Sequence, residues 1–337
     1  MTEAQGTPTS DKQPAPRVRF GNTDLHVSRL CQGTAFRHLP RTAVESRGQQ
    51  VLRHCLEQGV NFFDSAVAYG WGGSEEALGK AIRGHRDRVV VCTKVVPSYA
   101  PAREDDAPQP ARFTRDFLSQ QVEASLRRLG TDYLDLYLLH QPDEGTPAEE
   151  IVGAMDALVQ SGKIRYWGAS NHPAAQVREF VALSTGSGRD SIAGLEEYYT
   201  IAGVALSDAG EHRVEQLERE MFPVVRDAGL GLLAFSPLDA GHLVPGRTVE
   251  PDSPLAALVQ VLDEVAHGLG VSRASVCVAW VLAHQEVTSV LGGAESPEHV
   301  DEHLAGTRLV LPADALAALN AASAVYREER VAEVRGE

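Results

Sequence analysis

Short apolar runs along the chain alternate with longer segments whose apolar residues recur at helical spacing. The short runs are rich in Val, Ile, Leu and aromatic residues, as buried strands are. Strands are expected at residues 30–34, 60–65, 89–95, 134–140, 164–170, 192–198, 231–236 and 288–292. Helices are expected at residues 43–57, 75–83, 115–129, 148–161, 174–183, 214–228 and 273–284.

Several of the expected strands are apolar without interruption, as in VVVCTKVV and LDLYLLH. Such runs are typical of parallel strands that are buried on both faces. Eight strands in alternation with helices predict a closed (β/α)8 TIM barrel in preference to an open, doubly wound sheet. An open dinucleotide-binding sheet would need a glycine fingerprint before its first helix, but the one similar run, residues 229–234, precedes a strand.

A hairpin and two long loops complete the predicted domain. Residues 17–28 are expected to form an N-terminal β-hairpin ahead of the barrel. Residues 97–112 and 240–255 read as long loops after the third and seventh strands, where they would overhang the C-terminal face of the barrel. The barrel is predicted to span residues 17–325, between a disordered tail, 1–16, and a polar tail, 326–337.

Composition and charge narrow the classes of function. The chain has 337 residues, of which 43% are hydrophobic and 23% charged, as in an ordinary globular enzyme. A net charge of −15 argues against nucleic acid or a membrane surface as partner, because both need a basic surface. No apolar leader is read at the start, and the four cysteines form no CxxC pair. A cytoplasmic location is therefore expected.

Four titratable residues stand at the ends of consecutive expected strands. Asp64 and Tyr69 follow the second strand, Lys94 ends the third, and His140 ends the fourth. Taken singly, Tyr69 or His140 would more often be an ordinary core residue. Because strand ends converge on one mouth in a (β/α)8 barrel, the four together predict an active site.

Lys94 is the most informative of the four, because only four of the 31 basic side chains are lysines. An ammonium about 4 Å from a phenol contributes roughly 4 kcal/mol at an effective dielectric of about 20, or about three pKa units. Asp64 would offset part of this effect. Tyr69 is thus expected to protonate a carbonyl oxygen that His140 orients. The alternative is a lysine that extends out of the barrel rim.

Five motifs resemble signature regions of the aldo-keto reductases: GVNFFDSAVAYG, VVVCTKV, LGTDYLDLYLLHQPD, GKIRYWGASN and AFSPLDAGHL. The match runs over residues 18–304. The resemblance implies a barrel that binds NADPH/NADP+, or NADH, and transfers a hydride to an aldehyde or ketone. It also implies that Tyr69 is the proton donor, Lys94 its activator and Asp64 the partner of the lysine, with His140 orienting the carbonyl.

The resemblance further implies which residues bind cofactor and substrate. Ser170 and Asn171 would hold the nicotinamide carboxamide, and Phe235 would stack on the ring. The expected cofactor residues are Gly33, Thr34, Asp64, Ser170, Asn171, Glu196, Phe235, Ser236, Leu238, Gly241, Gly293, Ala294, His299, Glu302 and His303. The expected substrate pocket is Phe36, Trp71, Tyr99 and His172.

Two positions depart from the family pattern. Glu196 stands where a glutamine usually contacts the carboxamide, and a carboxylate accepts hydrogen bonds but cannot donate them. Near the adenosine phosphate, Glu295 replaces a basic or small polar residue, and His303 replaces an asparagine. We therefore expect a modest preference for NADPH that grows as His299 and His303 become protonated towards pH 6.

Three other functions are left open. His299 to His303 spell HxxEH, an inverted zinc-peptidase motif, although a catalytic zinc needs a third ligand, and no metal is expected. A non-catalytic nicotinamide-binding regulatory module, like the potassium-channel beta subunits that resemble this family, is a second alternative. A reductase of nucleotide-linked deoxysugars is a third.

Overall fold

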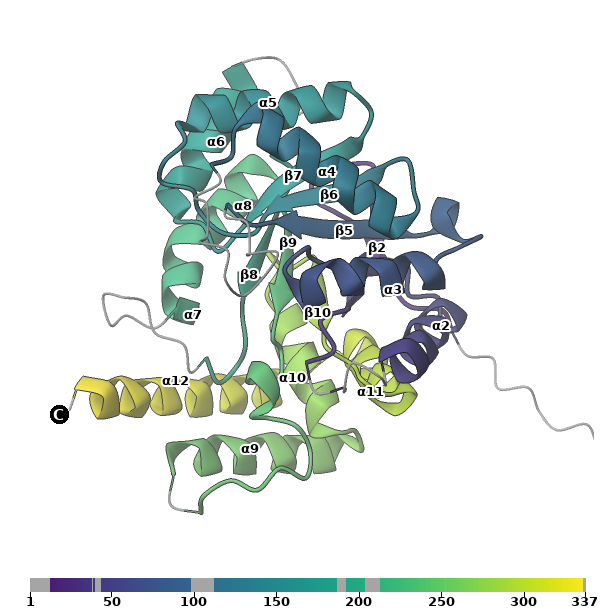
Figure 1. Cartoon of the computed structure of the whole chain (residues 1–337). Coiled ribbons are helices and arrows are strands. Elements are labelled where there is room, and N and C mark those ends of the chain that lie inside the picture. Colours follow the sequence, from purple (N-terminus) through teal and green to yellow (C-terminus); the bar gives the residue numbers. More distant parts are fainter. Residues whose placement is uncertain are drawn as a thin grey trace, which may run out of the picture.

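The computed structural model describes residues 13–37, 39, 44–97, 112–186, 192–203, 213–251 and 253–335. Parallel strands close into a barrel in the order β10-β3-β4-β5-β6-β7-β8-β9, with helices around it (Figure 1). The strands are β3 (Leu30–Gly33), β4 (Phe62–Asp64), β5 (Val90–Val95), β6 (Leu134–Leu139), β7 (Ile164–Ser170), β8 (Gly194–Tyr198), β9 (Gly231–Phe235) and β10 (Ser289–Gly292). Each lies within a predicted strand, so the predicted (β/α)8 barrel is confirmed.

The helices follow the predicted alternation, with additions near the C-terminus. They are α2 (Gln49–Glu57), α3 (Gly73–Ala81), α4 (Arg115–Leu129), α5 (Ala148–Gln160), α6 (Ala174–Gly186), α7 (Arg213–Gln216), α8 (Phe222–Ala228), α9 (Pro254–Leu269), α10 (Arg273–Leu282), α11 (Pro297–Arg308) and α12 (Ala313–Arg335). Short helical turns are η1 (Val44–Gly48), η2 (Tyr69–Gly72), η3 (Arg86–Arg88), η4 (Leu217–Met221) and η5 (Asp239–Gly241). Helices α9, α11 and α12 were not among the predicted elements, and α9 packs on α12.

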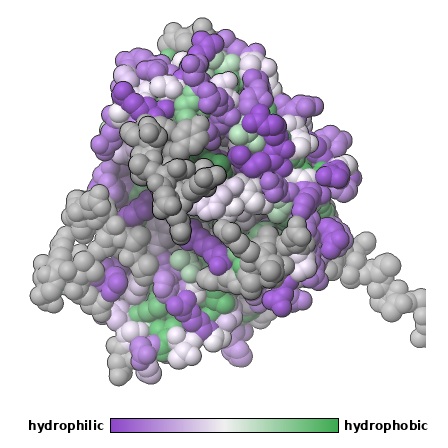
Figure 2. All heavy atoms as spheres, in the orientation of Figure 1, coloured by the Kyte–Doolittle hydropathy of each residue, from purple (hydrophilic) through white to green (hydrophobic). Residues whose placement is uncertain are grey.

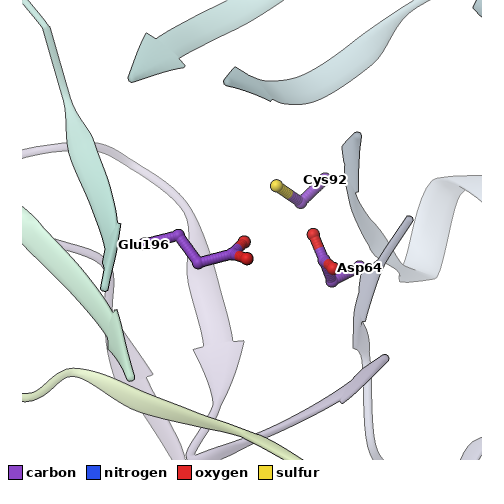
Figure 3. Close-up of side chains that lie close together, drawn as sticks. All are labelled: Asp64, Cys92 and Glu196. Atoms are coloured by element: carbon purple, nitrogen blue, oxygen red, sulfur yellow. The ribbon is translucent and has the colours of Figure 1, made fainter. Parts of the chain in front are cut away.

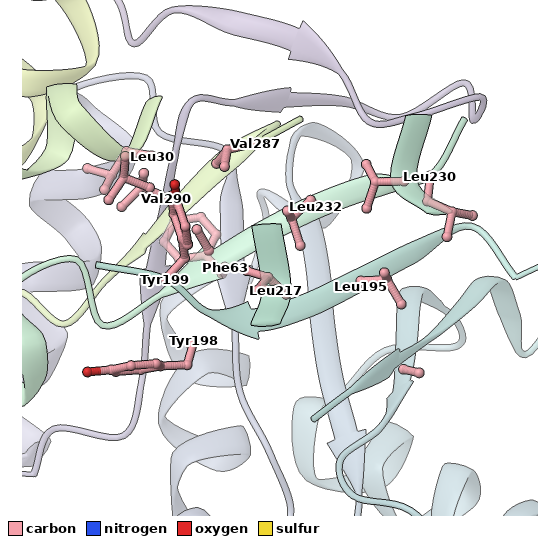
Figure 4. Close-up of a cluster of buried hydrophobic side chains, with 14 of the residues drawn as sticks. Leu30, Phe63, Leu195, Tyr198, Tyr199, Leu217, Leu230, Leu232, Val287 and Val290 are labelled. Carbon is pink, nitrogen blue, oxygen red and sulfur yellow. The ribbon is translucent and has the colours of Figure 1, made fainter. Parts of the chain in front are cut away.

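Alternation along the strands divides the core into two clusters. Val91 and Val95 of β5 face the outer helices, whereas Val90 and Cys92 face the barrel interior. Figure 4 shows part of the outer cluster, including Leu195 of β8. Side chains alternate between the two faces of a strand, so a residue two positions beyond one of the interior cluster also points inward. At the C-terminal end of a strand, such a residue points into the mouth of the barrel.

The predicted N-terminal hairpin is confirmed as an antiparallel pair, β1 (Arg17–Arg19) and β2 (His26–Ser28). It closes the bottom of the barrel through Phe20, which is fully buried and lies 5.7 Å from Phe62, centroid to centroid. A Cβ on Gly194 would lie 2.4 Å from the Phe20 ring, and one on Gly231 would lie 2.5 Å from it. The absence of a side chain at these two glycines makes room for the Phe20 ring. The hairpin thus covers the N-terminal end of the barrel, and the candidate site is sought at the C-terminal end.

Parts of the segments predicted as tails contact the rest of the domain. Residues 13–16 contact the barrel, since the Ala15 amide donates to the Gln58 carbonyl at 3.0 Å. Residues 326–335 are the last turns of α12, where Tyr326 and Arg327 are buried. The expected loop 97–112 falls almost wholly outside the described residues, whereas the expected loop 240–255 runs into α9.

Polar side chains cover most of the face in Figure 2, and apolar ones gather at the lower edge, where Figure 1 places α9. Within the described ranges, no single helix is long and apolar enough to cross a membrane. Two bent helix pairs, α9 with α10 and α11 with α12, reach the length and apolar composition of a membrane span only when the two helices of each pair are counted together.

Candidate active site

Lys94 lies inside the barrel mouth, because it shares the interior parity of Cys92 on β5. It is fully buried, and its Nζ pairs with Asp64 at the end of β4 through a very short contact. The same Nζ lies 3.0 Å from Glu196 Oε2 and donates to the Ser65 carbonyl at 3.2 Å. The alternative of a lysine that extends out of the rim is therefore wrong.

Glu196 comes from β8, across the barrel from β5, and is only 3% exposed. Figure 3 shows its carboxylate facing that of Asp64, with the Cys92 sulfur beside them. One ligand atom from each of these three residues lies within 4.8 Å of the others. The cation that they surround is the Lys94 ammonium, so the geometry is that of an ion-pair cluster.

Burial sets the proton distribution in this cluster. Burial, and next the charge of Asp64, raise the pKa of Glu196 to about 8, while Lys94 opposes the rise. Burial also raises the pKa of Asp64, again against Lys94. Burial alone would lower the pKa of Lys94, but the charges of Asp64 and Glu196 raise it well above its usual range. Both carboxyl groups are therefore harder to ionise than a free carboxyl group, whereas the ammonium holds its proton more tightly.

The Tyr69 ring lies over the Lys94 ammonium, and His140 lies beside Tyr69. The Tyr69 ring, in η2, has its centroid 5.4 Å from Lys94 Nζ. The His140 ring meets it edge-on, with centroids 5.8 Å apart. The barrel thus brings together all four residues that the sequence pattern singles out.

The expected lowering of the Tyr69 pKa is wrong for this arrangement. Burial raises that pKa, and the charges of Asp64 and Glu196 add to the rise, so the opposing effect of Lys94 does not prevail. The phenol therefore keeps its proton at neutral pH. Burial, aided by Lys94 and Arg37, lowers the pKa of His140 to about 3, which keeps the imidazole neutral.

Asn171 connects the ends of several strands. Its backbone is left-handed, with φ 59°, and its amide donates to Glu197 Oε1 at 3.1 Å. Its side-chain Nδ2 donates to the His140 carbonyl at 3.2 Å and to Ser170 Oγ at 2.9 Å. Arg213 donates to its Oδ1 at 3.0 Å. Sequence reasoning missed Glu197 and Arg213, although adjacent glutamates in an apolar strand are an unusual signal.

The turn after β9 has a left-handed backbone at several residues. Ser236 has φ 61°, Ala240 φ 50° and Gly241 φ 92°, and the Leu238 carbonyl accepts the Gly241 amide at 3.0 Å. Successive residues of this kind form concave anion-binding surfaces. Arg247, which was also missed, donates to the Gly241 carbonyl at 3.0 Å. Phe235 precedes the turn, half-buried against Tyr198.

The segment after β10 differs from expectation. His303 is buried, and a Cβ on neighbouring Gly292 would lie 2.6 Å from its Nδ1. Burial, then the charge of His299, lower the pKa of His303 to about 4, so its expected protonation near pH 6 is wrong. His299 is exposed on the first turn of α11, and the Glu302 carbonyl accepts from Ser275 Oγ. Within the described ranges, no metal-binding cluster includes either histidine.

The other predicted cofactor residues lie at the ends of β3 and β10. The Thr34 hydroxyl donates to the Asp64 carbonyl at 3.0 Å, next to Gly33 at the end of β3. The Ala294 carbonyl, beside exposed Gly293, accepts from Gln32.

In the expected substrate pocket, Phe36 and His172 are buried, whereas Trp71 is 63% exposed. The Phe36 ring packs against Gly48, where a Cβ would lie 3.1 Å away. His172 Nδ1 lies 2.8 Å from the Ser170 carbonyl, and burial lowers its pKa to about 4. Tyr99 lies outside the described residues.

The chain is a (β/α)8 protein, because its eight parallel strands close into a barrel, and a buried lysine–carboxylate cluster lies at the C-terminal end of that barrel. The chain belongs to the aldo/keto reductase family, whose sequence profile matches residues 29–324. This confirms the family that the motifs indicated.

The relatives of this chain have different printed functions. It is 30% identical to the uncharacterized oxidoreductase YrpG of Bacillus subtilis, over 89% of this chain and 94% of the relative. It is 33% identical to methylglyoxal reductase YeaE of Escherichia coli, over 80% and 82% of the two chains. It is 30% identical to a probable voltage-gated potassium channel subunit beta of Oryza sativa, over 85% and 89%. Sequence similarity alone therefore does not distinguish an enzyme from a regulatory module, and the residues of the candidate site must decide between them.

Proposed function

We propose that this protein reduces an aldehyde or ketone to an alcohol with a nicotinamide cofactor, and that Tyr69 donates the proton. The observation that carries the proposal is the fully buried Lys94, paired with Asp64, beneath the Tyr69 ring. A buried charge is costly unless it is paired, and perturbed groups concentrate at functional sites.

The residues divide the work as follows. A carbonyl oxygen gains negative charge as it is reduced, so a nearby O–H donor stabilises the transition state. Tyr69 is protonated before the reaction, and Lys94 stabilises the phenolate that forms when the proton leaves. Asp64 fixes the ammonium. Neutral His140 donates one ring N–H to the carbonyl oxygen, which orients it.

The residues present fit a nicotinamide cofactor, which would supply the hydride. The left-handed turn at 236–241, with Arg247 beside it, suits a pyrophosphate. Phe235 offers an aromatic face, and the Ser170 hydroxyl lies at the strand end next to Asn171. Glu196, while protonated, donates and accepts hydrogen bonds as an amide does. We propose NADPH as the preferred cofactor, with NADH accepted.

The regulatory alternative has a specific observation in its favour, namely the relatives named as channel beta subunits. The assembled Tyr69, Lys94, His140 and Asp64 favour an enzyme, because binding alone needs no proton donor. We further propose a small-molecule carbonyl substrate and a reducing, cytoplasmic location, in keeping with four free, buried cysteines.

The test is deuteride transfer. The protein is incubated with NADPH that carries deuterium on the transferred position and with a carbonyl panel that includes methylglyoxal. We expect the alcohol product to contain one deuterium for each cofactor oxidised. Binding of NADPH, followed by fluorescence, without any turnover would support the regulatory module instead. Absence of binding would contradict both functions.

A further inference from the structure

Two buried carboxyl groups share one ammonium in this site. Lys94 Nζ contacts Asp64 and lies 3.0 Å from Glu196 Oε2, and all three side chains are at most 3% exposed. If both carboxyl groups were ionised, the cluster would hold an uncompensated negative charge in a buried place. Such a charge is costly, so a proton on one carboxyl group is the favourable state.

The groups that face Glu196 come from four other elements. They are Cys31 of β3, Asp64 of β4, Lys94 and Cys92 of β5, and Tyr69 of η2. Burial raises the pKa of both thiols well above the usual range, so they remain neutral. Tyr69 is neutral for the same reason. Among these described groups, Lys94 supplies the positive charge, which leaves the Asp64 and Glu196 carboxyls as the pair that shares a proton.

We propose that Glu196 is a positioning residue that carries this proton and releases it to solvent when the oxidised form of the cofactor binds. The proposal rests on the proposed function. The oxidised nicotinamide ring is a cation, whereas the reduced ring is neutral. A cation bound in the mouth stabilises the ionised carboxyl group, and by linkage the ionised carboxyl group strengthens binding of that cation.

The two protonation states would favour opposite ends of the reaction. With Glu196 protonated, the cluster is neutral overall, and Tyr69 is a better proton donor. With Glu196 ionised, its charge raises the pKa of Tyr69 further, as the direction of that interaction indicates. As pH rises, the rate of carbonyl reduction should therefore fall, and the affinity for the oxidised cofactor should increase. A glutamine at this position would keep the neutral state at every pH.

The test is a calorimetric count of protons. Binding of NADP+ and of NADPH to the full chain is measured near pH 8 in two buffers with different enthalpies of ionisation. At a pH equal to the pKa of Glu196, about half of the molecules carry the proton before cofactor binds. We therefore expect about half a proton to be released per NADP+ bound, and none per NADPH bound. Comparing the two cofactors cancels ionisation of their shared phosphates. From pH 7 to pH 9 the affinity for NADP+ should rise by at most about tenfold per pH unit, relative to NADPH.

Glu196→Gln should abolish the difference between the cofactors. The matched control is Glu75→Gln, since Glu75 is also a buried glutamate paired with a cation, Arg128, but lies outside the barrel mouth. The control should release protons as the wild type does. Equal proton release by wild type and Glu196→Gln would overturn the proposal. Failure of the wild type to bind either cofactor would contradict the proposed function, and the inference with it.

A second measurement does not depend on Glu196→Gln, in case that variant does not fold. Infrared spectroscopy should show the C=O stretch of a protonated carboxyl group at neutral pH in the wild type and also in Glu197→Gln, which removes the neighbouring glutamate whose pKa burial likewise raises to about 8. We expect this band to lose intensity when NADP+ is added and to persist with NADPH. A band that is absent, or that responds equally to both forms, would contradict the proposal.

Discussion

The two ends of the barrel each hold a buried carboxylate cluster, and the clusters are built in opposite ways. At the N-terminal end, Asp135 of β6 is 2% exposed and contacts two arginines, Arg86 at 2.7 Å and Arg165 at 3.0 Å. It also accepts the Val91 amide at 3.0 Å. At the C-terminal end, a single Lys94 serves both Asp64 and Glu196.

We propose that this difference in charge balance separates a structural network from a functional one. The Asp135 carboxylate has two cations around its one negative charge, and both arginines reach solvent, which relieves their charge. The Lys94 cluster is short of positive charge and fully buried, so its proton content depends on what lies nearby. A buried cluster that is short of counter-charge changes its protonation when a charged ligand binds. A cluster with excess counter-charge keeps its protonation and stabilises the fold.

The sharpest test of this contrast is Lys94→Arg, which should lower kcat/KM by about 10²- to 10³-fold, nearly as much as Lys94→Met. A planar guanidinium cannot replace a point charge that is fully buried between two carboxyl groups. The matched control is Lys163→Arg, at a partly exposed pair with Glu123, where activity should be unchanged. If Lys94→Arg kept most of its activity across a pH series, any cation would serve in the mouth.

At the other end, Asp135→Asn should destabilise the protein and leave the chemistry intact. We expect the free energy of unfolding to fall by about 1–3 kcal/mol, because two arginines lose their shared partner. Denaturant unfolding and cofactor titration together check this. A large change in cofactor affinity with no loss of stability would break the distinction between the two ends.

The pH dependence of stability should differ between wild type and Glu196→Gln. The native state raises the pKa of Glu196 from 4.5 to about 8, so between these values it holds a proton that the unfolded state has lost. The contribution of this group to stability is thus present below pH 4.5 and is lost as pH rises towards 8. Relative to the variant, wild-type stability should fall by about 1.4 kcal/mol per pH unit in that window. Parallel curves would mean that Glu196 is ionised in the folded protein.

Much of this architecture follows from sequence patterns that act locally. Short apolar runs predicted all eight barrel strands, and parity along β5 explains why Lys94 faces inward once Cys92 does. The four residues at strand ends could be gathered into one site because barrel closure brings such ends together.

What was missed depends on contacts across the barrel. Glu196 reaches Lys94 from the opposite side, at a distance that no spacing in the sequence encodes. The pKa of Tyr69 was misjudged because burial and this second carboxyl group outweigh the lysine. The hydrogen bonds of Arg213 and Glu197 with Asn171 likewise join segments that are separate in the sequence and meet only in the folded protein.

The smallest expected effect concerns His303, a buried group that forms no ion pair with any of the described residues. Because burial lowers its pKa to about 4, it stays neutral from pH 8 to pH 6. The ratio of kcat/KM for NADPH over NADH should therefore have the same pH dependence in His303→Gln as in wild type, within about twofold. A pH dependence that disappeared in the variant would show that His303 gains a charge and binds the phosphate.

The central claim is that Tyr69, placed over the Lys94 cluster, protonates the carbonyl oxygen. The most direct measurement is the single-turnover rate of NADPH oxidation by wild type and Tyr69→Phe, with cofactor and carbonyl both saturating. We expect the rate in Tyr69→Phe to be lower by roughly 10²- to 10⁴-fold, with the dissociation constant for NADPH unchanged within about twofold. A Tyr69→Phe variant that turns over at the wild-type rate would contradict it.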